Sequence, residues 1–208
     1  MKKLSYVLVI SMLAVILPAT ANEAGKALYQ ASVACHGATA GGNVSMGAPA
    51  LAGQQQAYLQ RQLENFKKGI RGTAAGDTGG AQMVAMAESL PTGQAVNDVS
   101  AYLASLPAAA SAGQQSGDLR NGNNYYHSKC GACHGGKAEG NSSLNAPRLS
   151  GLSADYIKRQ YHNFQQGIRG AHADDRYGRQ MKLMSSSLPT DKDLDDVIFY
   201  IQAQGAAE

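Results

Sequence analysis

The sequence predicts an all-α protein in which one helical unit is written twice. Two observations support this prediction: a repeat with a constant offset of 98 residues, and apolar residues at helical spacing near the end of the second copy. Residues 35–104 and 133–202 are identical at 33 of 70 positions without a gap. No segment of any length alternates in the apolar and polar pattern of a strand. We therefore expect a tandem duplication of an α-helical domain.

Each copy is expected to contain three helices. The first leads into a Cys-His pair, the second follows a long glycine-rich loop, and the third closes the copy after a methionine-bearing loop. Gly69 and Gly167 end the second helix, because glycine readily takes the left-handed conformation that follows a helix. The expected ranges, first copy and then second, are 22–34 and 117–132, 54–68 and 152–166, and 93–105 and 191–203.

The N-terminus has the pattern of a secretory signal peptide. Lys2 and Lys3 form a basic start, residues 4–18 are an apolar run, and an A-x-A cleavage site follows, ending at Ala21. The run is short for a membrane-spanning helix, which is the alternative interpretation. We expect residues 1–21 to be removed and the mature protein to be periplasmic, with no transmembrane segment.

The charge balance gives no support to nucleic-acid binding. The whole chain has 18 basic and 15 acidic side chains, a formal net charge of +3. Removal of the signal peptide takes away two lysines and no acid, which leaves the mature chain at +1. A nucleic-acid-binding domain is usually strongly basic. With 6% aromatic residues and no Trp, two small domains would gain from a large apolar ligand to pack around.

The expected domain boundaries follow from the repeat and from one segment of small residues. Residues 107–117 are rich in Ala, Ser, Gly and Gln, which is typical of a linker. We expect a first domain at 22–106 and a second domain at 118–208.

The second copy contains an intact C-x-x-C-H motif, the attachment sequence of c-type haem. Cys130 and Cys133 are three residues apart, so that on one helical turn each can add to a vinyl group of the haem. His134 follows directly and is expected to be an axial ligand of the iron. A zinc site would need four protein ligands, and a redox C-x-x-C motif does not need the histidine. Both alternatives therefore fit less well.

The first copy contains a degenerate form of this motif, SVACH. It keeps Cys35 and His36 but lacks the other cysteine. Upstream of the motif the offset falls from 98 to 97, so one residue is missing between Tyr29 and Cys35. Counted back from the histidine, Ser32 stands where the cysteine should be. We expect a haem attached through Cys35 alone, with His36 as axial ligand; loss of this haem and a one-codon error in the sequence are the alternatives.

A methionine is expected as the second axial ligand in each copy. Met83 and Met181 each lie 47 residues after the histidine of their copy. Methionine opposite histidine raises the reduction potential, which suits an electron carrier. Spacing alone does not separate these residues from Met86 and Met184, three positions further on, and methionines also fill ordinary cores.

Other repeated polar residues have two interpretations each. Pro49 and Pro147 follow their histidine by 13 residues, so their carbonyl groups can orient the ligand ring, or they can simply interrupt a loop. Four arginines recur and either bind haem propionates or are solvated: Arg61, Arg71, Arg159 and Arg169. Three histidines without a partner in the first copy are interpreted as surface residues: His127, His162 and His172.

These motifs resemble those of the dihaem cytochrome c4 family. "APxLxG", "YxxRQ", "NFxxGIRG" and "QMxxMxxSLPT" occur in both halves, and the resemblance covers the whole mature chain. It implies two class I cytochrome c domains, two haem c groups per chain, and haems that face each other near the domain interface. The family pattern also places the axial methionine eight residues before a proline, which selects Met83 before Pro91 and Met181 before Pro189.

The resemblance implies an electron-transfer protein with no substrate turnover of its own. Its expected partners are redox proteins, with a quinol–cytochrome c reductase-type donor and a terminal oxidase as acceptor; peripheral association with a membrane is left open. The cytochrome subunit of a flavocytochrome c sulfide dehydrogenase is similar, and it is the first alternative. A haem peroxidase is the second, although it would need an open iron position where each copy offers a methionine.

Overall fold

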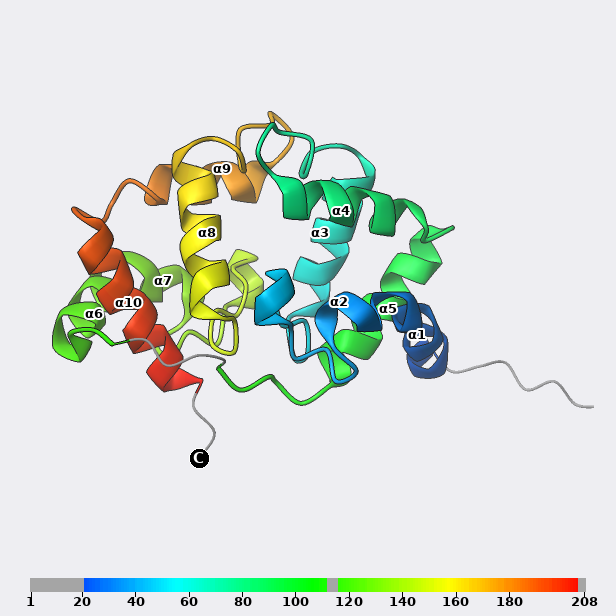
Figure 1. Cartoon of the computed structure of the whole chain (residues 1–208), viewed down its shortest axis with the longest axis horizontal. Coiled ribbons are helices and arrows are strands. Elements are labelled where there is room, and N and C mark those ends of the chain that lie inside the picture. Colours follow the sequence, from blue (N-terminus) through cyan, green and yellow to red (C-terminus); the bar gives the residue numbers. More distant parts are fainter. Residues whose placement is uncertain (1–20, 112–115, 206–208) are drawn as a thin grey trace, which may run out of the picture.

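The computed structural model describes residues 21–111 and 116–205, and in these ranges the chain is helical. Figure 1 shows two lobes, one for each copy of the repeat. Two isolated bridges, one per copy, are the extent of β pairing in the described ranges. The predicted signal peptide, apart from Ala21, and residues 112–115 of the predicted linker lie outside the described residues. The all-α prediction is confirmed for the part that the structure describes.

The same order of elements occurs in both lobes. The first contains α1 Ala21–Tyr29, η1 Gln30–Ser32, α2 Val33–His36, η2 Val44–Met46, α3 Gln56–Lys67, α4 Thr78–Glu88 and α5 Gly93–Ser105. The second contains α6 Leu119–Tyr125, η3 Tyr126–Cys130, α7 Gly131–His134, η4 Ser142–Leu144, α8 Ala154–Gln165, α9 Arg176–Met184 and α10 Asp191–Gln204. The three predicted helices per copy are present, and the first of them is divided into shorter pieces.

The prediction of a methionine-bearing loop is wrong, because the methionines lie on helices α4 and α9. Each helix begins after a buried aspartate, Asp77 or Asp175, whose carboxylate accepts a hydrogen bond from the N–H of Gly80 or Gly178. Such a cap satisfies one of the free N–H groups of the first turn. Glycines near the start of each segment resemble a loop, but Ala, Gln, Leu and Met further along favour a helix once it is capped.

Each lobe has its own apolar core between its first and last helices. Gly25 allows α1 to cross α5 closely, since a Cβ there would collide with the carbonyl of Asp98, and Gly122 allows the same crossing of α6 over α10. The buried side chains of the two cores include Tyr29, Leu59, Val96, Val99 and Leu103, and Tyr126, Leu194, Val197, Ile198 and Ile201. The inner helices, α3 and α8, pack against these cores and form the middle of the molecule (Figure 1).

The two lobes meet through polar contacts between the regions of α3 and α8. The buried side chain of Gln54 donates to the carbonyl of Arg148 and accepts from its N–H, both at 3.0 Å. Arg61 donates to Asn145 across the same interface, at 3.1 and 2.8 Å. Among the described residues before the gap, Ala108 packs over Gly53 and Ala109 over Gly151, so the start of the linker also contacts both lobes.

Candidate functional site

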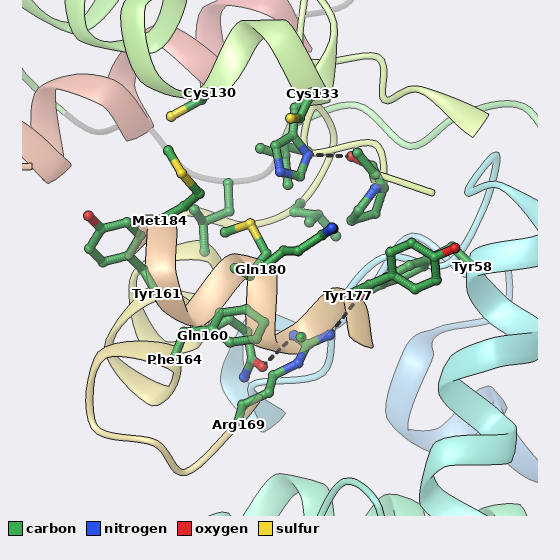
Figure 2. A pocket seen from close by; sticks show the side chains of 18 of the residues that line it. Tyr58, Cys130, Cys133, Gln160, Tyr161, Phe164, Arg169, Tyr177, Gln180 and Met184 are labelled. Atoms are coloured by element: carbon green, nitrogen blue, oxygen red, sulfur yellow. Dashed lines mark hydrogen bonds between the residues drawn. The ribbon is translucent and has the colours of Figure 1, made fainter. Parts of the chain in front are cut away.

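A large pocket surrounds the Cys-His segment of each lobe, and the two pockets are closely similar. Counted with their open mouths, they enclose about 1350 Å³ in the second lobe and about 1230 Å³ in the first. The Cys-His segment of the lobe forms one wall, and the methionine helix, α9 or α4, contributes to another. Figure 2 shows the second pocket, with Cys130 and Cys133 on one side and Met184 beside them. A pocket of this size, with predominantly apolar walls, suits a large flat ligand.

His134 is held in a fixed orientation in the second pocket. Its Nδ1 lies 2.8 Å from the carbonyl oxygen of Pro147, and because a carbonyl can only accept, Nδ1 must carry the proton. Burial lowers the pKa of His134, which favours the neutral ring. Nε2 therefore keeps a lone pair for a metal. The predicted proline contact is confirmed for this copy.

The two cysteines of the second motif lie next to this histidine. Cys130 is at the N-cap of α7 and lines the pocket, and Cys133 lies on the following turn. Burial raises the pKa of the Cys130 thiol to about 11, with a smaller contribution from Cys133. Both cysteines are free of disulfides, and within the described ranges no group of three or more His, Cys, Asp or Glu side chains is placed to hold a metal ion. The arrangement therefore fits thioether attachment better than zinc binding.

The first pocket repeats this geometry except at one position. The Nδ1 of His36 donates to the carbonyl of Pro49 at 2.8 Å, and burial lowers the pKa of His36. Cys35 and Ser32 both line the pocket. Ser32 is the N-cap of α2, as Cys130 is the N-cap of α7, so the hydroxyl stands at the position of the missing thiol.

The missing residue of the first copy lies upstream of this position. Between the tyrosine and the cap, the second lobe has a π-helical turn, Tyr126–Cys130, while the first has the tighter 3₁₀ turn Gln30–Ser32. A π turn holds one more residue than an α turn, so a deletion here is absorbed locally. The hydroxyls of Tyr29 and Tyr126 still donate to the carbonyls of Gly37 and Gly135, each at 2.6 Å.

The methionine candidates all reach the pockets. Met83 and Met86 line the first pocket, and Met181 and Met184 line the second. In the second lobe the side chains differ in exposure, because Met184 is 41% exposed whereas Met181 is half-buried. Because an axial ligand of the haem iron is expected to be shielded from water, this difference favours Met181 over Met184.

The repeated arginines separate into two kinds. Arg71 and Arg169 are buried, so the solvated interpretation is wrong for them, while Arg61 is half-buried and Arg159 exposed. Arg71 lines the first pocket and Arg169 the second. The Nε atoms of Arg61, Arg71 and Arg169 are buried with no hydrogen-bond partner in the described residues. Unpaired donors beside each pocket fit the acidic groups of a haem.

Sequence reasoning missed a set of residues that form a wall common to both pockets: Leu152, Tyr58, Gln62, Tyr156 and Gln160. Each of the two glutamines accepts hydrogen bonds from both Arg71 and Arg169, at 2.6 to 3.1 Å. Burial alone would raise the pKa of Tyr58, but the guanidinium groups of Arg169 and Arg71 lower it. The tyrosines and the glutamines recur at the 98-residue offset, so the repeat itself could have identified them as candidate site residues.

The three unmatched histidines lie away from the ligand positions. His127 is exposed, and its Nε2 lies 3.1 Å from the hydroxyl of Tyr200. His172 is also exposed, and His162 is half-buried on α8. None of the three lines either pocket.

Comparison with known proteins agrees with this geometry. The family model "Cytochrome c" matches twice, over residues 22–107 and 119–204. Cytochrome c4 from Azotobacter vinelandii is 30% identical over 81% of this chain and 82% of that protein. A thiosulfate dehydrogenase electron acceptor from Thiomonas intermedia is 34% identical over 66% of this chain and 64% of that protein. The crystal structure of reduced cytochrome c4 from Pseudomonas stutzeri superposes with a TM-score of 0.71, at 26% identity, over 89% of this chain and 98% of that one. The chain therefore belongs to the cytochrome c family, within the dihaem cytochrome c4 group of tandem-domain proteins.

Proposed function

We propose that the chain is a periplasmic electron carrier with one haem c in each pocket. Membership of the cytochrome c4 group makes it a dihaem electron-transfer protein and not an enzyme. In the proposal, Cys130 and Cys133 hold the second haem and Cys35 alone holds the first. The axial pairs are His36 with Met83 and His134 with Met181. The domain boundaries are those of the repeat, 22–106 and 118–208.

The strongest support for two haem sites is the repeated histidine geometry. In both pockets a buried histidine donates its Nδ1–H to a proline carbonyl at 2.8 Å, which leaves Nε2 available to iron. The degenerate first copy keeps this bond, although it has lost one cysteine. When bound, haem supplies reversible one-electron exchange between ferrous and ferric iron. The protein residues fix the ligand orientation and cover the group with apolar walls.

The intact mass of the denatured mature protein tests the haem sites. The protein is expressed with a c-type haem attachment system and its mass is compared with that of the polypeptide. We expect two added haem masses, one on each half of the chain after proteolysis between the lobes. A single added mass, located on the second half, would contradict attachment through Cys35. No added mass would contradict both sites.

For the partners, we propose a quinol–cytochrome c reductase-type donor and a terminal oxidase acceptor, reached by a soluble protein in the periplasm. The signal-peptide pattern supports that location. In the described ranges, none of the helices combines the length and the apolar character needed to cross a bilayer. The prediction is that the ferrous protein supports oxygen uptake by an isolated terminal oxidase, and that uptake stops when the protein is omitted.

A second donor is favoured by a specific similarity. Proteins named thiosulfate dehydrogenase electron acceptors, from Stutzerimonas stutzeri and Thiomonas intermedia, are among the relatives of this chain. Under this proposal the ferric protein is reduced when it is mixed with thiosulfate and a thiosulfate dehydrogenase, as followed by the haem absorbance. Reduction by the quinol oxidising enzyme but not by this mixture would favour the respiratory donor instead.

A further inference from the structure

We propose that each haem pocket is completed by an arginine of the opposite lobe, and that Arg61 of the first lobe binds a carboxylate of the haem held in the second lobe. This inference rests on the proposed haem in the second pocket and adds a residue from outside that domain. It gives the first lobe a role in the second redox centre that does not depend on the first haem.

Arg61 extends from α3 across the interface to the wall of the second pocket. Its Nη1 donates to the side-chain oxygen of Asn145 at 3.1 Å, and its Nη2 donates to the backbone carbonyl of the same residue at 2.8 Å. The guanidinium carbon lies 4.5 Å from the centre of the Tyr177 ring. Asn145 and Tyr177 belong to the second lobe, and both line the pocket together with Arg61. The arginine is therefore fixed in place by the domain whose pocket it enters.

One nitrogen atom of the Arg61 guanidinium group, Nε, is left without a partner among the residues that the structure describes. Both terminal nitrogens have neutral acceptors on Asn145, but Nε is buried and bonded to nothing in the described residues. A guanidinium group cannot give up its proton under ordinary conditions, so its buried donors are satisfied only by an acceptor that comes to them. The pocket beside it is where such an acceptor can lie.

The charges around this position favour an anion. Two charged side chains line the pocket near Arg61: the guanidinium group of Arg169 and the carboxylate of Asp175. The hydroxyls of Tyr58 and Tyr177 lie near Arg61 as well. Asp175 already accepts a hydrogen bond from the N–H of Gly178, and no ion pair within 4.0 Å joins it to either arginine in the described ranges. Two cations therefore face one carboxylate, and a propionate group of haem supplies the balancing negative charge.

The arrangement is reciprocal but unequal. Arg159, the repeat partner of Arg61, extends from α8 to the carbonyl of Gly47 and lines the first pocket. Arg159 is exposed, however, whereas Arg61 is half-buried and has two bonds to its anchor. The haem site of the second lobe is therefore expected to depend on Arg61 of the first lobe more than the haem site of the first lobe depends on Arg159.

The test is a redox titration of the full-length, haem-loaded chain with the substitution Arg61→Gln. Removal of a cation near a haem favours the ferric form, so the midpoint potential of the second haem is expected to fall while that of the first stays unchanged. Arg61→Lys, which keeps the charge, is expected to retain most of the potential. Arg120→Gln, an exposed arginine on α6, is the matched control and is expected to change neither potential.

Two further measurements keep the outcome clear. A Cys35→Ser background leaves the second haem as the covalently held one, which assigns its wave in the titration. Intact mass shows whether each variant carries that haem. An unchanged second potential in Arg61→Gln, with the haem present, overturns the inference; so does a fall that Arg61→Lys does not reverse. A second lobe without haem would instead contradict the proposed function itself.

Discussion

At the scale of single residues, the carboxylate of Asp196 joins the first and last helices of the second lobe. It accepts hydrogen bonds from the ammonium group of Lys192, the N–H of Asp118 and the side-chain amide of Asn121, at 2.7 to 2.8 Å. The hydrogen bond from Lys192 is the main cause that lowers the pKa of Asp196 to about 2. The ionised form is therefore the one that stabilises the fold.

The pH dependence of stability follows from this shift. The pKa of an aspartate in the unfolded chain is about 3.9, so the contribution of Asp196 is complete above that pH and is lost as the pH falls toward about 2. We expect Asp196→Asn to lower the free energy of unfolding by about 1–2 kcal/mol at pH 7. As the pH is lowered, the free energy of unfolding of the variant is expected to fall less than that of the unaltered protein. Urea titrations between pH 7 and pH 3 measure both effects.

The repeat supplies a matched control for this prediction. Asp98, the equivalent residue of the first lobe, accepts a hydrogen bond from the neutral side-chain amide of Gln94. We expect Asp98→Asn to cost less than Asp196→Asn at pH 7. Equal acid profiles for Asp196→Asn and the unaltered protein would show that the Asp196 carboxylate does not contribute as argued.

At the scale of elements, the degenerate SVACH motif of the first copy differs from the intact motif by two separate changes. The deletion lies in the turn before the motif, where the second lobe has a π turn and the first a 3₁₀ turn. The replacement of cysteine by serine lies at the N-cap of α2. The backbone angles at this cap, φ −98° and ψ −10°, are near those at Cys130, φ −117° and ψ −40°. The deletion has therefore not moved the attachment position away from the pocket.

From this separation we predict that Ser32→Cys alone restores two thioether bonds to the first haem. No residue has to be inserted, because the position already lines the pocket. The tryptic peptide of the variant that spans residues 27–61 is expected to carry haem and to have no thiol left that an alkylating reagent can modify, whereas attachment through Cys35 alone would leave the new thiol reactive. The absorption maximum of the ferrous α band is expected to move to shorter wavelength, since a second vinyl group becomes saturated. As a comparison, Ser45→Cys adds an exposed thiol on η2 and is expected to leave the spectrum unchanged.

At the scale of the whole molecule, the duplication made most of the fold predictable, but not the contacts between the copies. Helix ranges, the histidine–proline pairs and the cysteines follow from local pattern and from the repeat. The burial of Arg71 and Arg169 does not, because their partners Gln62 and Gln160 lie partly on the other lobe. An offset between copies shows which residues recur, and it carries no information about which surfaces meet. The methionine helices were missed because their caps depend on aspartates that follow glycine-rich turns.

Gln54 provides a test of how strongly the two lobes are coupled. Its side chain is buried and pairs with both backbone groups of the half-buried Arg148, so Gln54→Ala leaves the N–H and the C=O of Arg148 without these partners. A loss of about 1–3 kcal/mol is expected at the interface. The repeat position of Gln54 is Leu152, which offers no compensating amide from the other side.

We predict that the unaltered protein unfolds in one calorimetric transition and that Gln54→Ala broadens or divides it. The physical reason is that both pockets share walls from both lobes, so unfolding of one lobe removes part of the other pocket. The ratio of calorimetric to van't Hoff enthalpy measures this coupling. Gln60→Ala is the control, because Gln60 bonds to Asn97 within its own lobe. If both variants gave one sharp transition at the same temperature, the coupling would have to lie in the arginine and glutamine contacts between the pockets instead.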